Sequence, residues 1–362
     1  MRGGAAPRLG VLALLLFAAA CASSPPRAVP PSLPGPPPAP LDPPSPPSVG
    51  GLSVASLPGW AQEDHLAALT AYAAGCAPSR LVGMTCDAAR ALLAKAPSPS
   101  DARAFLERSF VATEVRTDDG ERGLLTAYFA PEYPARRTPD AEFDAPVLGK
   151  PSNPGTVGDR AAIEAGSARS PVLAWMRAED LFFLQIQGSG TLTFPDGARE
   201  RAAYAADNGA RFVGVARPMA ERGLLPRDGT SGDAIRAWLA AHRGPEARSV
   251  MALNPRYIFF VTAPDDGREA TGAAGVPLPA RRSVAVDPSR WSYGDAVWIE
   301  ADGGNLRGAR ASYRGWVMAL DTGSAIRGPV RADLYIGRGD AAGQEAGAVR
   351  HPLRMWRLTP KG

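Results

Sequence analysis

Two aspartates near the C-terminus stand where apolar runs meet turns, as carboxylates that do chemistry often do. The apolar run 316–320 ends on Asp321, and Asp333 opens a second short apolar run at 334–336. Glycines around both acids allow the backbone to turn tightly beside them. A carboxylate at the edge of a buried strand either ties a loop by hydrogen bonds or acts as a general acid or base.

The residues around Asp321 have one local interpretation that the wider sequence disfavours. Asp321, Thr322 and Gly323 match the signature of aspartic proteases, in which two aspartates share one proton. This chain carries a single Asp-Thr-Gly, so such an enzyme would have to be a dimer. The second glycine turn, at Gly337, also follows too soon for an intervening flap. The protease remains the weaker alternative.

Composition narrows the classes of function. The chain has 362 residues, of which 45% are hydrophobic and 21% charged, enough for two domains with a sizeable core. The net charge of +4 comes without a basic stripe interleaved with aromatics, which argues against nucleic acid. The three histidines, His65, His242 and His351, show no metal-ligand spacing, so we expect neither a metal nor another cofactor.

The first residues have the pattern of an export signal. Arg2 and Arg8 give a positive start, and the apolar segment 11–20 is too short to span a membrane comfortably. Residues 1–20 are therefore predicted to be a signal peptide.

Small residues lead directly into Cys21, and this junction resembles a bacterial lipobox, although Ala18 replaces the usual leucine. The resemblance implies a lipidated N-terminal cysteine, and Ala22 after it implies an outer-membrane lipoprotein facing the periplasm. Plain signal-peptidase cleavage is the alternative. The segment 21–58 is rich in proline, with 13 prolines within 25–49, and we expect an extended linker there.

Helices are expected at the start of the folded part. The apolar spacing predicts one helix over 61–74, another over 87–96, and a third after 98–100. Cys76 and Cys86 flank the connection between the first two. In an exported protein this pair could form a disulfide that staples the two helices.

Strand patterns dominate the rest of the chain, apart from a proline-rich irregular stretch that reaches about 171 and a helix expected over 233–242. Short β-type runs bounded by Gly and Pro turns are expected at 123–129, 181–187, 191–194, 201–204, 257–262, 283–286, 296–300 and 313–320. Many short strands with helices mostly at the ends favour an all-β barrel core with helical additions.

Several segments resemble, in the same order, the successive motifs of one enzyme family. These segments are 126–131, 182–190, 204–209, 254–260, 275–278, 282–287, 319–323 and 332–335. Together they are similar to the MltA family of membrane-bound lytic murein transglycosylases over about residues 120–360. One departure lies beside the second acid, since Arg331 and Ala332 stand where relatives often carry other residues, including His-Phe.

The resemblance implies a mainly β fold: a double-psi β-barrel with N-terminal helices and a second small β domain inserted, with a substrate groove between them. The implied boundaries are 59–134 and 262–362 for the barrel and 135–261 for the insert.

The implied activity is cleavage of the β-1,4 bond between N-acetylmuramic acid and N-acetylglucosamine with formation of a 1,6-anhydro ring. Asp333 would be the acid and then the base, with Asp321 and Asp287 as its neighbours. A non-catalytic wall-binding or wall-loosening module is the other open alternative. The expected partners are peptidoglycan glycan strands, the membrane through a lipid anchor, and wall-synthesis or division proteins.

Sugar contacts are expected in the groove from amide, hydroxyl and aromatic side chains and from glycines that allow close approach. Turn architecture or core packing is the alternative for each of them. The expected residues are Tyr128, Gln187, Gly188, Ser189, Gly190, Tyr204 and Asn208.

Overall fold

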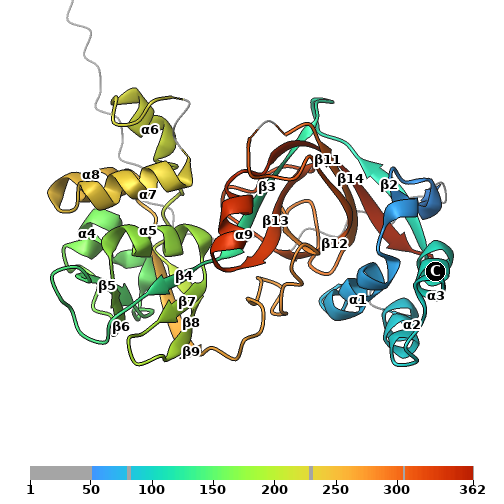
Figure 1. Ribbon diagram of the computed structural model, residues 1–362, viewed down its shortest axis with the longest axis horizontal. Helices are drawn as coiled ribbons and strands as arrows, with labels where there is room; N and C mark the ends of the chain where they lie inside the picture. Colours follow the sequence, from blue (N-terminus) through green and yellow to red (C-terminus); the bar gives the residue numbers. More distant parts are fainter. Residues whose placement is uncertain (1–50, 80–82, 228–230, 305, 362) are drawn as a thin grey trace, which may run out of the picture. The chain divides into compact units, whose positions relative to one another are not determined.

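The computed structural model describes residues 51–79, 83–227, 231–304 and 306–361 (Figure 1). The expected signal peptide, Cys21 and most of the expected linker lie outside these residues. Residues 51–58, also expected in the linker, contain the short strand β1 (Leu52–Ser53), which pairs with β2 (Phe110–Val115), and the 3-10 turn η1 (Val54–Ser56). Within the described ranges, no helix is long and apolar enough to cross a bilayer.

Three helices follow the 3-10 turn η2 (Trp60–Gln62), as the apolar spacing predicts. They are α1 (His65–Gly75), α2 (Met84–Leu93) and α3 (Pro99–Ser109). Asp64 caps α1 by accepting from the Ala67 amide at 3.0 Å, and Ser98 and Asp101 form a reciprocal capping box on α3. A disulfide joins Cys76 to Cys86 and links the end of α1 to α2.

Six strands close into a barrel. In ring order they are β14 (Arg350–Pro360), β11 (Ala296–Asp302), β12 (Ser312–Asp321), β10 (Ser283–Ala285), β13 (Arg331–Arg338) and β3 (Gly123–Ala130). A second pairing of β14 with β3 closes the ring. Two neighbouring pairs, β10 with β12 and β13 with β3, are parallel, and the remaining ring pairs are antiparallel. The fold is mainly β with a double-psi type of barrel, as expected.

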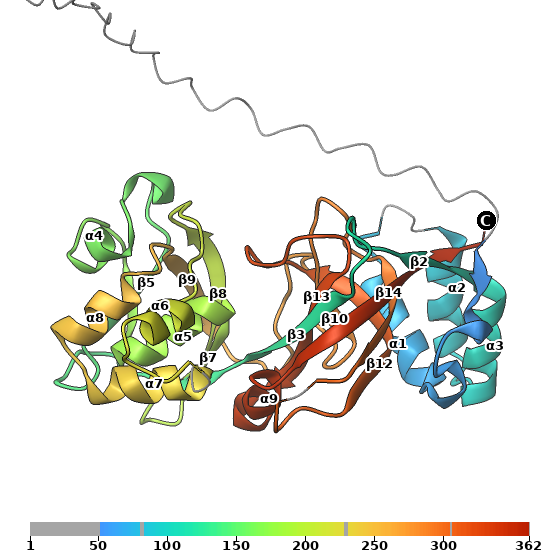
Figure 2. The same ribbon diagram turned by 90° about the horizontal axis from the view of Figure 1, so that it is seen from above.

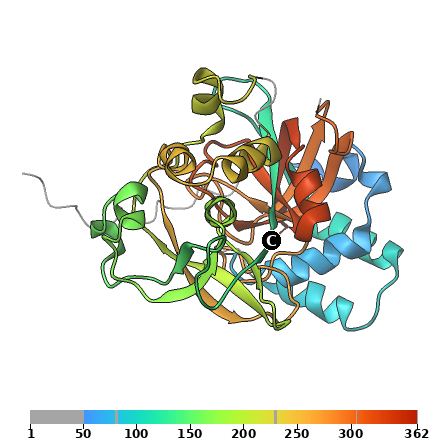
Figure 3. The ribbon, with the colours of Figure 1, turned by 60° about the vertical axis from the view of Figure 1, so that its left-hand side comes forward.

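The barrel has an apolar interior and a second apolar layer on its outside. Alternate residues of β13 show this, because Ala332, Leu334 and Ile336 belong to the interior cluster, whereas Tyr335 belongs to the cluster shared with α1–α3. Figures 1 and 3 show the helices α1–α3, coloured from blue to teal, beside the orange and red strands, and α1 packs on β12. Asp333, which alternates with the interior residues, therefore projects from the outer face.

A second group of elements lies in the chain between β3 and β10 (Figure 2). Its four-stranded sheet consists of β4 (Glu132–Pro134), β7 (Gly190–Thr193), β8 (Arg199–Asp207) and β9 (Ile258–Pro264), and its two-stranded sheet of β5 (Ala145–Leu148) and β6 (Val172–Met176). The expected hairpin is confirmed, because β7 and β8 pair antiparallel across Pro195-Asp196-Gly197.

This middle group is also more helical than the strand pattern indicates. It contains η3 (Pro154–Thr156), α4 (Arg160–Glu164), α5 (Ala178–Gln187), α6 (Ala216–Glu221), α7 (Gly232–Ala241) and α8 (Pro245–Met251). The helix expected over 233–242 is α7. A last helix, α9 (Gly339–Ala346), connects β13 to β14.

The strand predicted over 181–187 is wrong, because these residues form most of α5. Glu179 and Asp180 stand in its first turn, where the helix dipole favours negative charge. The buried positions Leu181, Leu184 and Gln185 are spaced by three and four residues, which is helical periodicity. The alternation of polar and apolar residues at the end of the run had indicated a strand instead.

Candidate active site

The sheet register brings the two candidate acids to the same level of the barrel. Ala285 of β10 pairs with Asp321 of β12 on one side and with Asp333 of β13 on the other. Asp333 in turn pairs with Thr126 of β3. The row Asp321–Ala285–Asp333–Thr126 thus crosses four neighbouring strands, although its members lie up to 207 positions apart in the chain.

Asp333 is partly exposed and accepts one hydrogen bond, to Oδ1 from the Thr126 hydroxyl. The Arg331 guanidinium donates through Nη2 to the same hydroxyl oxygen at 2.9 Å. Burial raises the pKa of Asp333, and the nearby charge of Asp321 adds to this rise, whereas the Thr126 hydrogen bond and the Arg331 charge oppose it. A carboxyl with these surroundings keeps its proton to a higher pH than an ordinary aspartate, as a general acid requires.

Asp321 is more fully hydrogen-bonded. Its Oδ2 accepts from the Tyr128 hydroxyl at 2.7 Å, and its Oδ1 accepts from the amides of Ala273 and Thr322, each at 2.9 Å. Burial raises the pKa of Asp321 against the pull of these three donors. Burial and the neighbouring Asp321 likewise raise the pKa of Tyr128, which therefore stays a phenol that can donate. Asp321 therefore both ties a loop and belongs to the row.

Asp287 is tied into its own loop. Its Oδ1 accepts from the Ser289 amide at 3.0 Å and hydroxyl at 2.8 Å, and its Oδ2 accepts from the Gly328 amide at 2.8 Å. Burial alone would raise the pKa of Asp287, but these hydrogen bonds lower it below the ordinary value. The structure records no contact of Asp287 with Asp321 or Asp333 among the described residues, and its bonds are those of a loop-tying carboxylate.

The expected sugar-contact residues between β3 and β10 have different surroundings. Gln187 ends α5, and its Oε1 accepts from the Phe129 amide of β3 at 3.4 Å. Gly188 adopts φ +81° as the left-handed cap of α5, and Ser189 follows it partly exposed. A Cβ on Gly190 would lie 2.8 Å from the Pro131 carbonyl oxygen, so close backbone packing requires glycine there.

Tyr204 and Asn208 differ in how open they are. Tyr204 is 51% exposed on β8, and its hydroxyl donates to Asp207 at 2.7 Å. Asn208 is buried, and its amide nitrogen donates to the carbonyls of Gly158 and Pro255 while its Oδ1 accepts from the Tyr257 amide. Tyr204 is thus about half exposed, whereas the Asn208 amide already joins its own segment to those of Gly158 and 255–257.

Two residues that hydrogen-bond in or beside the row, Thr126 and Arg331, were not singled out from the sequence as site residues. Thr126 stands two positions before Tyr128, and Arg331 two positions before Asp333, so each shares a strand face with a residue that was. That period-two spacing was the available signal. Their hydrogen bonds to one another depend on the parallel pairing of β13 with β3, which local sequence does not specify.

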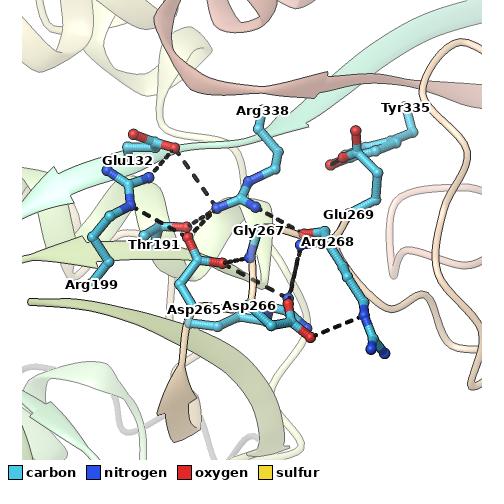
Figure 4. A network of polar contacts seen from close by, with 11 residues as sticks. Glu132, Thr191, Arg199, Asp265, Asp266, Gly267, Arg268, Glu269, Tyr335 and Arg338 are labelled. Carbon is cyan, nitrogen blue, oxygen red and sulfur yellow. Dashed lines mark hydrogen bonds and ion pairs between the residues drawn. The ribbon is translucent and has the colours of Figure 1, made fainter.

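A polar network ties the strand of Asp333 to the segments that lead into and out of the middle group (Figure 4). Arg338, at the end of β13, donates to Asp265 at 2.5 Å, to Thr191 at 2.9 Å and to the carbonyl of Arg268 at 2.8 Å. Asp265, whose side chain is 3% exposed, also meets Arg199, which contacts Glu132 at 2.6 Å. This network, defined by Arg338, Asp265, Arg199, Glu132 and Thr191, is called the crossing network below.

Charged side chains that line another hollow of the surface already form ion pairs with one another. A cavity of about 570 Å³ lies over α5 and α7, and its acids Glu179 and Asp180 are ion-paired with Arg243 and Arg236. In the described part of the chain, no group of three or more His, Cys, Asp or Glu side chains is arranged to hold a metal ion. The row around Asp333 is the best candidate for chemistry.

Comparison with known proteins agrees with this geometry. Residues 124–261 match the MltA specific insert domain, and residues 282–359 match the 3D domain. The membrane-bound lytic murein transglycosylase A of Vibrio cholerae is 35% identical over 241 residues, and that of Escherichia coli K12 is 33% identical over 242 residues. Each alignment covers 65% of this chain and 65% of the relative's length.

Solved structures extend the similarity over more of the chain. A membrane-bound lytic murein transglycosylase from Agrobacterium tumefaciens is 32% identical with a TM-score of 0.70, and the match covers 86% of this chain and 97% of that one. The E. coli MltA with bound chitohexaose is 28% identical with a TM-score of 0.67, covering 87% and 93%.

The closed barrel and the two matched segments define a 3D-domain protein with an MltA-type insert. The chain belongs to the MltA family of membrane-bound lytic murein transglycosylases.

Proposed function

We propose that the protein is a lytic transglycosylase that cleaves the β-1,4 bond between N-acetylmuramic acid and N-acetylglucosamine in peptidoglycan. The observation that carries the proposal is Asp333, a partly exposed carboxyl whose pKa is raised, in a row with Asp321 on the outer face of the barrel. The family membership supplies the reaction class, and the names of the relatives supply the substrate.

A single acid suffices for this reaction. Asp333 gives its proton to the glycosidic oxygen as the bond from that oxygen to C1 of the muramic sugar breaks. The resulting carboxylate then accepts the proton of the 6-hydroxyl as O6 attacks C1, which closes the 1,6-anhydro ring and restores the acid. No water is consumed. A hydrolase, in contrast, needs a second carboxylate to activate water or to form a covalent intermediate.

The other two aspartates would support Asp333 in different ways. Asp321 places a negative charge near Asp333 and so helps to keep the acid protonated, while Tyr128 holds Asp321 in position. Asp287 would act on the loops that flank the site, through its bonds to Ser289 and Gly328.

The substrate would lie in a groove between the barrel (59–134 and 262–362) and the inserted domain (135–261). The relative with bound chitohexaose, a β-1,4-linked glycan, supports a glycan as the ligand. Tyr128, Gln187, Gly188, Ser189, Gly190, Tyr204 and Asn208 are the proposed contacts. The exposed ring of Tyr204 is the best placed to stack on a sugar, and Asn208 would act through the loops that it joins.

The N-terminal part would anchor the enzyme. The proposal is a signal peptide over 1–20, lipidation of Cys21 and an extended linker that leads from the outer membrane toward the wall. The relatives are named membrane-bound. Wall-synthesis or division proteins are the proposed partners. Palmitate labelling that persists in a Cys21→Ser variant would refute the anchor at this residue.

Mass spectrometry of digested murein sacculi tests the activity. Anhydro-ended muropeptides are expected from the wild-type protein and are expected to disappear with Asp333→Asn. Reducing-end products would instead indicate a hydrolase. Binding to sacculi without any product would favour the non-catalytic wall-binding module.

A further inference from the structure

Arg331 is partly exposed and hydrogen-bonded to the row that contains Asp333. It lies on β13 two positions before Asp333, so both side chains emerge from the same face of the strand. Its Nη1 donates to the carbonyl of Ala332 at 2.5 Å and to that of Leu124 at 3.4 Å, while its Nη2 donates to the Thr126 hydroxyl. The two carbonyls hold the guanidinium in place beneath the hydroxyl.

The chemistry of these groups sets the direction of the bond from Arg331 to Thr126 and favours one direction for the bond between Thr126 and Asp333. An arginine only donates, whereas a threonine hydroxyl has one hydrogen and two lone pairs. Arg331 therefore occupies one lone pair of Thr126 Oγ1, and its positive charge favours the orientation in which the hydroxyl hydrogen points away from the guanidinium, toward Asp333 Oδ1. The chain of donation runs from Arg331 to Thr126 to Asp333.

This direction decides which oxygen of Asp333 carries the proton. Since Oδ1 accepts from Thr126, a protonated Asp333 has its hydrogen on Oδ2, which has no hydrogen-bond partner within the described residues. Without the guanidinium charge, the Thr126 hydroxyl could more readily rotate and accept the Asp333 proton itself. That internal bond would turn the acid away from a substrate.

We propose that Arg331 is a positioning residue that holds the Thr126 hydroxyl as a donor, so that Asp333 presents its proton on Oδ2. The inference rests on the proposed function only in naming a glycosidic oxygen as the group that receives this proton. The other charged or titratable groups facing Asp333 are Asp321 from β12 and Tyr128 from β3, and β10 contributes the uncharged Ala285. The positive charge of Arg350 on β14 adds to burial in lowering the pKa of Arg331.

A double-mutant cycle separates this role from that of a simple charge. The variants are Arg331→Met, Thr126→Val and the two combined, with kcat and KM for anhydro-muropeptide release and the Asp333 pKa from a carbon-13 NMR titration as readouts. We expect Arg331→Met to lower kcat about tenfold with little change in KM, and to raise the Asp333 pKa. In the Thr126→Val background the same change should cost less than about twofold in kcat, and the rise in pKa should be less than half as large.

Equal effects of Arg331→Met in the two backgrounds would show that Arg331 acts by charge alone and would overturn the proposal. Arg331→Lys keeps a donor and should recover most of the lost rate, so equal losses in the Lys and Met variants would also overturn it. Arg350→Met is the matched control, because Arg350 pairs with Thr126 in the β14–β3 ladder, is exposed and has no ion pair among the described residues; its kcat should stay within about twofold of the wild-type value. If the wild-type protein releases no anhydro-muropeptides, the proposed function fails, and the NMR arm still decides the direction of the hydrogen bonds.

Discussion

Strand β13 carries a carboxylate in its middle and meets a second one at its end, and the two have opposite electrostatic surroundings. Asp333, in the middle, reaches Arg331 only through the Thr126 hydroxyl. Asp265, at the end, receives an N–H of Arg338 directly at 2.5 Å and lies 3.5 Å from Arg199. Burial raises the pKa of Asp333; at Asp265, burial is outweighed by Arg338, Gly267 and Arg199, and the pKa is lowered.

The difference shows how an arginine can serve an acid without removing its proton. Direct contact with a guanidinium favours the charged carboxylate and makes a structural ion pair. An intervening hydroxyl keeps the orientation that the arginine provides but weakens the stabilisation of the negative charge. One arrangement suits a joint between segments of the chain, and the other suits a proton donor.

The largest expected effect separates the two carboxylates by activity. Asp333→Asn removes the proton donor and should lower the rate of anhydro-muropeptide release by about 10³-fold, within the range that general acid catalysis supplies. Asp265→Asn should leave a measurable rate, because Asp265 contacts no reacting atom in the proposed mechanism. Comparable losses in both variants, with both proteins folded, would contradict the assignment of Asp333 as the acid.

The next effect separates them by stability. Asp265→Asn leaves Arg338 short of its partner and should lower the free energy of unfolding by about 3 kcal/mol, measured by chemical denaturation. The exposed pair Arg217–Glu221 is the control, and Glu221→Gln should change the free energy of unfolding by less than about 0.5 kcal/mol. Because the folded pKa of Asp265 is lowered, its contribution is present above the unfolded pKa of about 3.9 and is lost as the pH falls below that value.

A third effect concerns the pH dependence of catalysis. Asp333 must be protonated in the free enzyme, so kcat/KM should fall as the pH rises through its raised pKa. Thr126→Val removes a hydrogen bond that lowers this pKa, so the fall should move to higher pH. Thr126→Ser keeps the hydroxyl and should retain the wild-type profile. A shift to lower pH in the valine variant would contradict the hydrogen-bond direction.

The smallest effect reverses the usual sign of an active-site mutation. A carboxyl with a raised folded pKa reduces stability as the pH rises above the unfolded value, because the unfolded chain releases the proton more readily. Asp333→Asn removes this penalty and should raise the free energy of unfolding at pH 7 by about 1 kcal/mol. Asp287→Asn should instead lower it, since its loop bonds favour the charged form. We therefore expect the midpoint of unfolding at pH 7 to rise in Asp333→Asn and to fall in Asp287→Asn.

Sequence reasoning located much of this arrangement where a local pattern specified it. The apolar spacing predicted the helices α1, α2 and α3, and the turn residues between β7 and β8 predicted their hairpin. The strand prediction at 181–187 was wrong because it relied on the polar and apolar alternation at the end of the run and not on the three-and-four spacing of its buried positions. Thr126 and Arg331 were not predicted as site residues. Their roles depend on hydrogen bonds between β3 and β13, two strands that lie far apart in the chain.

The crossing network also bears on the order in which the chain assembles. Strand β3 is synthesised before its partner β13, so Thr126 cannot bond Asp333 until the chain has grown by 207 further residues. If the segment between β3 and β10 folds first, the bonds of Arg199 to Glu132 and Asp265 bring its two ends together. A gap of about 150 residues then behaves as a short connection, which removes on the order of 4 kcal/mol of loop-closure entropy from barrel formation. We therefore expect hydrogen exchange during refolding to protect β7 and β8 before β3, and the reverse order would contradict this sequence of events.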